Sequence, residues 1–332
     1  MNKLVKLSEY ARVAPPREER YVAVSASMTS LMNRVERVAP LPWPVLITGE
    51  SGVGKEGIAK ALHSRSPRAP RTFVAVDAGA IPQDLIESEL FGHERGSFTG
   101  AVTTHRGVFE CAHGGTLFLD EVGELSLPAQ ARLLRIIETL EVRRVGSSSS
   151  RKVDVRLVCA TNRDLRVMVE AGTFRADLYH RLACIVLTVP PLRERLEDLL
   201  ELIEHFLMQI SADLGRTMLS EGARIRLAAH TFPGNVRELR NVLCAAAAES
   251  VSGRIDTANI DTALGLLSTS SAPATFTPSS VEHAVQAAGG SLSAAARALG
   301  IPRSTLRDRL QAEARRASRI SGHAHVAELT HP

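Results

Sequence analysis

One stretch of the sequence decides the fold: Val45-Leu46-Ile47-Thr48-Gly49-Glu50-Ser51-Gly52-Val53-Gly54-Lys55-Glu56. Its first four residues are an apolar run that predicts a buried strand, and residues 55–63 have the apolar spacing of a helix. Between them lies G-x-x-x-x-G-K, in the strand, loop and helix context that a phosphate-binding loop requires. The glycines let backbone N–H groups wrap phosphates, and Lys55 neutralises the β and γ phosphates. The alternative, a chance glycine-rich turn, is disfavoured by this context.

Four more short apolar runs follow, at residues 73–76, 116–119, 155–160 and 185–189. Each of them predicts a buried parallel strand. Helical patterns lie between the strands, notably at residues 83–90 and 129–140. The fold class is therefore α/β, a doubly wound P-loop domain with a parallel five-stranded sheet.

The rest of the chain is predicted to be mostly helical. After Pro190-Pro191, helical patterns at residues 196–210, 221–229 and 235–248 predict a separate α-helical subdomain. The Ser/Thr/Pro/Ala stretch at 268–280 has the composition of a flexible linker. The expected organisation is a short N-terminal segment (1–21), an α/β domain (22–190), a helical lid (191–267), the linker (268–280), an all-α C-terminal domain (281–316) and a disordered tail (317–332).

The composition is that of a globular protein that can bury a core, with 44% hydrophobic residues in a chain of 332. Its four cysteines lie far apart and form neither a C-x-x-C pair nor a disulfide framework, which suits a reducing cytoplasm. The N-terminus has no apolar segment, and eighteen apolar residues nowhere run together. We therefore expect a cytoplasmic protein that is neither secreted nor inserted into a membrane.

The positive charge is concentrated near the C-terminus. Between residues 291 and 320 seven arginines face two acidic residues, a local charge of +5, so the remainder of a chain with net charge +4 sums to −1. Three helices are predicted here, at 281–288, 293–299 and 303–314. The third begins with Arg303, Ser304, Thr305 and Arg307, where a recognition helix meets the major groove of double-stranded DNA. Arg303 and Arg307 are candidate readers of guanine edges. The alternative is a solvated basic helix.

A second candidate site lies at the end of the third predicted strand. Glu56 stands where most phosphate-binding loops have the Ser or Thr that ligates Mg²⁺, so the metal ligand has to come from elsewhere. The strand at 116–119 is followed by Asp120-Glu121. Asp120 is the candidate Mg²⁺ ligand, and Glu121 is the candidate group that polarises the attacking water. Two solvated acids in a turn are the alternative.

With these residues in place, the chain resembles the sigma-54-dependent activators, or bacterial enhancer-binding proteins, over roughly residues 22–310. The deciding motif is Gly96-Ser97-Phe98-Thr99-Gly100-Ala101, similar to the family's G-A-F-T-G-A loop with Ser97 in place of alanine. The resemblance implies that this loop contacts the sigma factor, and its glycines and Phe98 suit a mobile contact loop. Alternatively, Phe98 is a buried anchor of a surface turn. Residues 295–306 resemble the Fis-type helix-turn-helix of these activators.

The resemblance also implies roles for polar residues elsewhere. Thr161-Asn162 is similar to the sensor that contacts the γ-phosphate or the lytic water. Arg175 and Arg181 match arginine fingers, which act on the neighbouring subunit's ATP and so imply a ring oligomer, expected to be a hexamer. Arg237 matches the second sensor, for which a helix start with solvated charges is the alternative.

Two residues depart from the family pattern. Asp77 stands where the family usually has an asparagine that restrains the catalytic glutamate. We expect Asp77 to repel Glu121 unless one carboxylate is protonated or water intervenes, so that hydrolysis is slower or differently regulated. Ser97 is the milder change, since Phe98 and Thr99 are retained.

The resemblance implies a transcriptional activator. It would bind upstream DNA and use ATP hydrolysis in a ring to convert the sigma-54 RNA polymerase closed complex to the open complex. Two other classes stay open: a regulator without productive sigma contact, and a generic P-loop ATPase such as a clamp loader or unfoldase. Only about twenty residues precede the motif-bearing part, so regulation is expected from abundance or from a protein that acts in trans.

Overall fold

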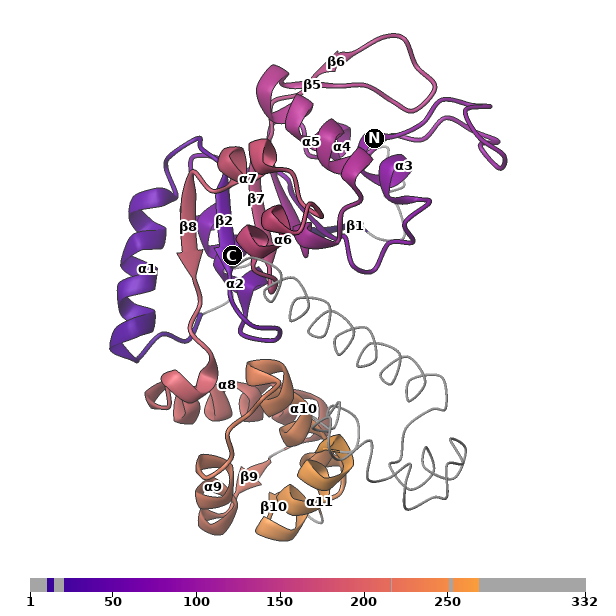
Figure 1. Ribbon diagram of the computed structural model, residues 1–332. Coiled ribbons are helices and arrows are strands. Elements are labelled where there is room, and N and C mark those ends of the chain that lie inside the picture. Colours follow the sequence, from indigo (N-terminus) through magenta and orange to yellow (C-terminus); the bar gives the residue numbers. More distant parts are fainter. Residues whose placement is uncertain (1–10, 15–20, 216, 251–252, 269–332) are drawn as a thin grey trace, which may run out of the picture. The chain divides into compact units, whose positions relative to one another are not determined.

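The computed structural model describes residues 11–14, 21–215, 217–250 and 253–268, and the predicted helix-turn-helix lies outside them. The main sheet has the strand order β1-β3-β4-β7-β2-β8 (Figure 1). Its strands are β1 (Ala11–Ala14), β2 (Val45–Thr48), β3 (Phe73–Asp77), β4 (Thr116–Asp120), β7 (Arg156–Thr161) and β8 (Ile185–Thr188). All neighbours from β3 to β8 are parallel, which confirms the predicted five-stranded sheet.

The sheet has one strand more than predicted. β1 pairs antiparallel with β3, with Ala11 opposite Val76, and extends the edge of the sheet. A run of four residues that includes Arg12 has too little pattern to indicate a strand. The N-terminal segment therefore joins the sheet through backbone hydrogen bonds. Such pairing leaves no pattern in the side chains from which a strand could be predicted.

Side chains of the parallel strands alternate between two apolar layers, as the two-residue period of a strand requires. In β2, Val45 and Ile47 belong to one layer and Leu46 to the other. The first layer includes residues of α1 (Ala26–Val38) and α2 (Lys55–Ser64). The second includes residues of α3 (Ile86–Phe91), α4 (Val108–Cys111), α5 (Leu127–Thr139), α6 (Leu165–Glu170) and α7 (Ala176–Leu182). The domain is therefore a three-layer sandwich, and the carboxyl ends of its strands share one edge.

The helical subdomain has an apolar core of its own. It contains α8 (Glu197–Leu214), α9 (Glu221–Ala228), α10 (Asn235–Ala248) and α11 (Thr257–Ser268), with a short parallel pair formed by β9 (Met218–Leu219) and β10 (Arg254–Ile255). The three helices predicted here are confirmed. The short strands were not predicted, because two residues carry no periodicity. None of the helices in the described ranges has both the length and the apolar character to cross a lipid bilayer.

A buried ionic cluster joins this subdomain to the start of α1. The Asp198 carboxylate of α8 accepts hydrogen bonds from the backbone N–H groups of Val24 and Ser25, both at 2.7 Å, and from the Ser25 hydroxyl at 3.0 Å. Arg195 lies 3.8 Å from Asp198 and donates to the Val53 carbonyl at 2.7 Å. Asp198 and Arg195 are 0% and 1% exposed, so each depends on the other for charge compensation.

Candidate nucleotide site and contact loop

The loop between β2 and α2 depends on glycines with positive φ. Gly52 has a φ of 77°, and Gly54, the residue directly before α2, has a φ of 100°. Lys55 opens the helix, is 6% exposed, and donates to the carbonyls of Gly49 at 3.0 Å and Glu50 at 3.3 Å. A buried ammonium group beside a helix N-terminus is an arrangement suited to bind phosphate.

The remaining residues of the predicted loop face different ways. Val53 is buried in the apolar layer, and Ser51 accepts a hydrogen bond from Arg237 at 2.9 Å. Glu56 is half exposed and lies 3.3 Å from Lys60 one helical turn later, so its carboxylate is paired along the helix and does not take the magnesium-ligand role of a Ser or Thr.

Two carboxylates lie at the carboxyl end of β4. Glu121 has a φ of 50°, an uncommon value for a residue other than glycine, and such backbone strain is often found at functional sites. Its Oε1 atom lies 3.6 Å from Lys55 Nζ, and its Oε2 atom accepts the Asn162 N–H at 3.1 Å. Asp120 accepts the Glu121 N–H at 2.9 Å, and burial together with the charge of Glu121 raises the pKa of Asp120 to about 6.

Asp77 lies beside these carboxylates. It is in register with Asp120 on the adjacent strand, and its Oδ1 atom accepts the Gly79 N–H at 2.9 Å. A Cβ atom at Gly79 would lie 3.2 Å from Asp77 Oδ1 and 3.8 Å from Glu121 Cβ, so the two acidic side chains flank this glycine. The negative charge of Asp77 is among the causes that raise the pKa of Asp120, whereas Lys55 offsets the charge of Glu121.

Two further predicted residues come from the strand next to β2 and from the lid. Thr161 is fully buried at the end of β7, in register with Thr48 of β2, and its hydroxyl accepts the Arg163 N–H at 3.0 Å. Arg237, at the start of α10, donates its backbone N–H to the Gly52 carbonyl at 3.2 Å. The structure thus connects Lys55, Glu121 and Asn162 directly, with Thr161 next to Asn162 in the chain. Asp120 and Asp77 lie beside Glu121, and Arg237 contacts the P-loop at Ser51 and Gly52. Their roles at the nucleotide stay predictions.

The two candidate arginine fingers lie apart from this group. Arg175 directly precedes α7 and Arg181 lies within it, and both are exposed. Arg175 pairs with Asp177 at 2.7 Å and is 43% exposed. Within the described part of the chain, neither arginine has a hydrogen bond or ion pair to the P-loop. Their role toward a neighbouring subunit stays a prediction.

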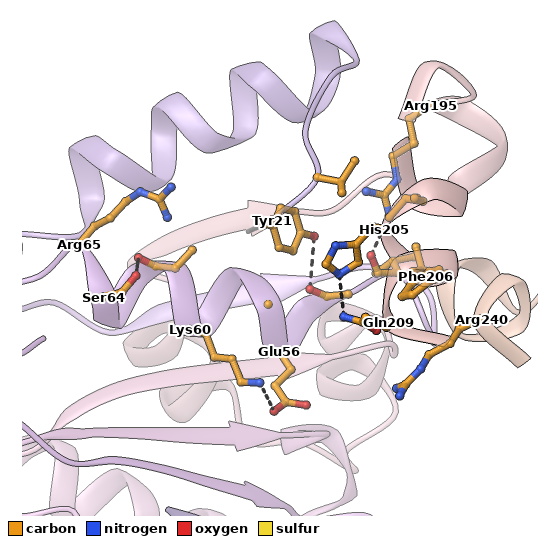
Figure 2. Close-up of a pocket in the computed structure, with 17 residues that line it drawn as sticks. Tyr21, Glu56, Lys60, Ser64, Arg65, Arg195, His205, Phe206, Gln209 and Arg240 are labelled. Atoms are coloured by element: carbon orange, nitrogen blue, oxygen red, sulfur yellow. Dashed lines mark hydrogen bonds and ion pairs between the residues drawn. The ribbon is translucent and has the colours of Figure 1, made fainter. Parts of the chain in front are cut away.

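A cavity of about 690 Å³ lies beside the P-loop (Figure 2). Gly54, Gly57 and Lys60 of the α2 region line one side, and Arg195, Phe206, Gln209 and Arg240 line the side formed by the helical subdomain. Tyr21 also lines it; its hydroxyl donates to the Gly54 carbonyl at 3.4 Å, and burial raises the pKa of this phenol. The volume is in the usual range for small-molecule sites. Sequence reasoning missed this pocket because its residues come from segments far apart in the chain.

The predicted contact loop projects from the α/β domain. Gly96 and Gly100 have φ values of 79° and 105° and no neighbouring atom within 4 Å of a Cβ position. Gly96 N–H donates to the Ala101 carbonyl at 2.8 Å, which closes the loop on itself, and Thr99 at its tip is exposed. Phe98 is 38% exposed and contacts His93 edge-on at 5.0 Å between ring centroids. Phe98 is thus not a buried anchor.

Ser97 fits this loop without displacing a neighbour. Its Oγ atom is buried and has no hydrogen-bond partner among the described residues. A Cβ atom at position 146 would lie 2.6 Å from the Cβ atom of Ser97. Because residue 146 is a glycine, Ser97 has the space that it needs. The hydroxyl therefore adds a polar atom but no new contact that would fix the loop.

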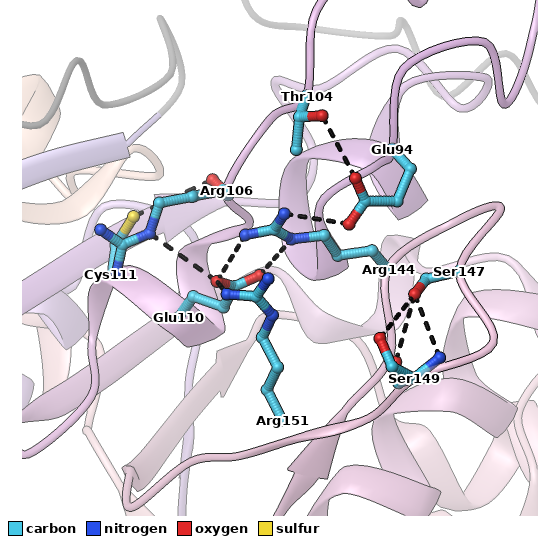
Figure 3. A network of polar contacts seen from close by, with 9 residues as sticks. All are labelled: Glu94, Thr104, Arg106, Glu110, Cys111, Arg144, Ser147, Ser149 and Arg151. Atoms are coloured by element: carbon cyan, nitrogen blue, oxygen red, sulfur yellow. Dashed lines mark hydrogen bonds and ion pairs between the residues drawn. The ribbon is translucent and has the colours of Figure 1, made fainter.

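The base of the loop is held by a network of ion pairs (Figure 3). Arg144, from the segment after β5 (Glu141–Val142), donates to Glu110 at 2.6 and 2.8 Å and to Glu94 at 3.1 Å. Thr104 donates to the other oxygen of Glu94 at 3.2 Å. Glu110 and Arg144 are both buried, and their hydrogen bonds raise the pKa of Arg144. The partners are 34 and 50 residues apart in sequence, so no local pattern could have identified them.

Three sequence families match the chain. The Sigma-54 interaction domain matches residues 21–188, the AAA+ ATPase lid domain matches residues 193–275, and the bacterial regulatory protein, Fis family, matches residues 281–312. The last match covers the predicted helix-turn-helix. The α/β domain and its helical lid therefore have the AAA+ fold.

Curated relatives carry two different names. The chain is 48% identical over 250 residues to the Nif-specific regulatory protein of Azospirillum lipoferum, covering 75% of this chain and 40% of the relative. It is 51% identical over 229 residues to the anaerobic nitric oxide reductase transcription regulator NorR of Escherichia coli O7:K1, covering 68% and 45%. The chain thus spans less than half the length of these curated relatives.

Solved structures show the same similarity. NtrX from Brucella abortus in complex with ADP has a TM-score of 0.67 at 32% identity, over 88% of this chain and 68% of that one. NtrX in complex with ATP has the same TM-score at 34% identity, over 90% and 70%. The Sigma-54 interaction domain matches residues 21–188, which is half of this chain, so the chain belongs to the sigma-54 activator family.

Proposed function

We propose that this protein is an ATP-hydrolysing transcriptional activator that remodels the sigma-54 RNA polymerase closed complex to the open complex. One observation carries the proposal: Lys55, Glu121 and Asn162 form a connected group at the P-loop, while the same domain exposes Phe98 on a glycine-flanked loop. The first arrangement suits phosphoryl transfer to water, and the second suits contact with a protein.

Each predicted residue has a role in this proposal. Residues 49–56 hold the nucleotide, with Lys55 on the β and γ phosphates. Glu121 polarises the attacking water, and the Asn162 N–H and Lys55 hold its carboxylate in place. Thr161-Asn162 and Arg237 sense the nucleotide, and the exposed Arg175 and Arg181 serve the neighbouring subunit of a ring, which we propose is a hexamer.

Mg²⁺ fits the residues around Asp120. This carboxylate is an oxygen donor of the kind that Mg²⁺ prefers, and Asp77 and Glu121 place further negative charge beside it. Burial, and then the charges of Glu121 and Asp77, raise the pKa of Asp120, so its ionised form is disfavoured in the protein without a cation. A bound divalent cation would favour the ionised form and neutralise charge on the phosphates.

The comparisons support the remaining parts of the proposal. The name of NorR describes a transcription regulator and that of the Nif-specific relative a regulatory protein, and the NtrX structures are of complexes with ADP and ATP. The Fis-family match supports DNA binding through Arg303, Ser304, Thr305 and Arg307. We further propose that residues 96–101 contact the sigma factor and that a protein acting in trans regulates the ring.

ATP turnover by the purified chain tests the catalytic part. Lys55→Ala and Asp120→Ala should abolish turnover, since they remove the phosphate contact and the metal ligand. An unchanged rate in either variant contradicts the assigned role.

Transcription in vitro from a sigma-54 promoter tests the coupling. Thr99→Ala should keep ATP turnover and lose promoter opening, because Thr99 lies at the exposed tip of the contact loop. If opening is unaltered, the loop does not contact the sigma factor. A wild-type protein that hydrolyses ATP and binds DNA but opens no promoter would favour a regulator without productive sigma contact.

A further inference from the structure

The Glu50 side chain of the P-loop points to the helical lid. Its carboxylate forms a two-point ion pair with Arg193, with Nη1–Oε2 at 2.8 Å and Nη2–Oε1 at 2.6 Å. Arg193 lies in η2 (Leu192–Glu194), the turn through which the chain enters the lid. A two-point pair fixes the orientation of both side chains, which a single contact does not do.

Asn235 holds the same carboxylate from another part of the lid. Its Nδ2 atom lies 3.1 Å from Glu50 Oε2 and 3.0 Å from the Ser51 carbonyl, and its Oδ1 atom accepts the Leu192 N–H at 2.8 Å. Asn235 is fully buried and has a φ of 54°, a left-handed conformation that asparagine tolerates better than most residues. One side chain therefore ties the P-loop, the entry turn of the lid and the start of α10 together.

Backbone contacts between the lid and the loop are equally close. A Cβ atom at Gly52 would lie 2.4 Å from the Gly234 carbonyl oxygen, and Arg237 N–H donates to the Gly52 carbonyl at 3.2 Å. The P-loop therefore cannot shift at residues 50–52 without changing its contacts with two segments of the lid.

Glu50 places a negative charge in a loop that is suited to phosphate. Hydrogen bonds from Arg193 and Asn235 lower the pKa of Glu50 to about 2, so its carboxylate stays ionised at neutral pH. An ionised carboxylate in this loop opposes the binding of an anionic ligand unless a cation offsets it. Arg193 is the arginine that forms the ion pair with it.

We propose that Arg193 and Asn235 are positioning residues for the nucleotide: both hold the Glu50 carboxylate on the lid side of the P-loop, Arg193 offsets its charge, and together they couple lid position to nucleotide affinity. The proposal rests on the proposed ATPase function. Neither residue needs to touch the reacting atoms, so their effect should fall on binding rather than on the chemical step.

Arg193→Ala in the full-length protein is the direct test. Removal of the guanidinium leaves Glu50 uncompensated, so the Kd for mant-ADP and the KM for ATP should rise about two- to fivefold while kcat stays near the wild-type value. Glu50→Gln in the Arg193→Ala background should restore most of the affinity, because the repelling charge is then absent. Arg193→Lys should lose less affinity than Arg193→Ala.

Arg226→Ala is the matched control. Arg226 is also a lid arginine paired with a carboxylate, Asp261, at 2.6 Å, and its side chain is 39% exposed against 45% for Arg193. The proposal is overturned if Arg193→Ala binds mant-ADP as tightly as Arg226→Ala, or if the Glu50→Gln double variant is as weak as Arg193→Ala. If the wild-type protein itself neither binds mant-ADP nor hydrolyses ATP, the proposed function fails instead.

Discussion

Asp198→Ala should destabilise the protein strongly, because this carboxylate is the centre of the junction between α1 and the lid. In the wild type it satisfies the backbone N–H groups of Val24 and Ser25 and compensates the guanidinium of Arg195. Alanine has no acceptor, so two backbone donors lose their partner and Arg195 loses its counter-charge.

The magnitude follows from burial. Asp198 is 0% exposed and Arg195 is 1% exposed, so solvent screens this pair little. Loss of one partner of a buried ion pair costs about 3–5 kcal/mol. A domain of this size shifts its melting temperature by about 2–4 °C per kcal/mol, so we expect a drop of about 6–20 °C.

Thermal unfolding followed by circular dichroism measures this drop. Asp261→Ala is the control, since Asp261 is a lid aspartate paired with an arginine but 52% exposed, and surface changes of this kind stay within about 0.5 kcal/mol. A loss for Asp198→Ala no larger than that of the control would refute the view that the buried cluster stabilises the junction.

Three other changes test separate features. Gly52→Ala should weaken mant-ADP binding, because the new Cβ would lie 2.4 Å from the Gly234 carbonyl oxygen and the backbone φ is 77°. A wild-type Kd would mean that the P-loop and the lid can separate without loss of affinity. Ser126→Ala removes the side chain that caps α5 and should cost about 0.5–2 kcal/mol in urea unfolding, whereas an unchanged midpoint would show that water replaces the cap. Burial lowers the pKa of His63, which contacts Thr116 at 2.9 Å, so the unfolded state binds more protons and stability is lost as pH falls below about 6.5. His63→Gln should reduce this acid dependence of the melting temperature. If the melting temperature of the variant and of the wild type falls equally between pH 7.5 and 5.5, His63 is not the responsible group.

The alternative of a generic clamp loader or unfoldase is no longer needed, since the chain belongs to the sigma-54 activator family. The expectation for Asp77 has become more specific. Its charge acts on Asp120, next to which it lies in register, while Lys55 offsets Glu121. Altered hydrolysis stays a prediction, now attached to the carboxylate proposed to ligate Mg²⁺.

The sequence by itself determined the five parallel strands, the lid helices α8, α9 and α10, and the P-loop, but neither the edge strand β1 nor α11. These features have local causes: a buried strand needs a short apolar run, an amphipathic helix needs a 3.6-residue period, and the phosphate loop needs glycines at fixed spacing. The strand at Val45–Thr48 and the helix at Asn235–Ala248 accordingly have the predicted bounds.

Tertiary structure alone decided which polar groups meet. Glu50 is 143 residues from Arg193 and 185 from Asn235, and Asp198 is 173 residues from Ser25. A charged residue has many potential partners in a sequence, and only the packing of the lid on the α/β domain selects one. Glu50 belongs to the nucleotide-binding motif, yet its carboxylate faces the lid, since a motif fixes the backbone of a loop but not the direction of each side chain.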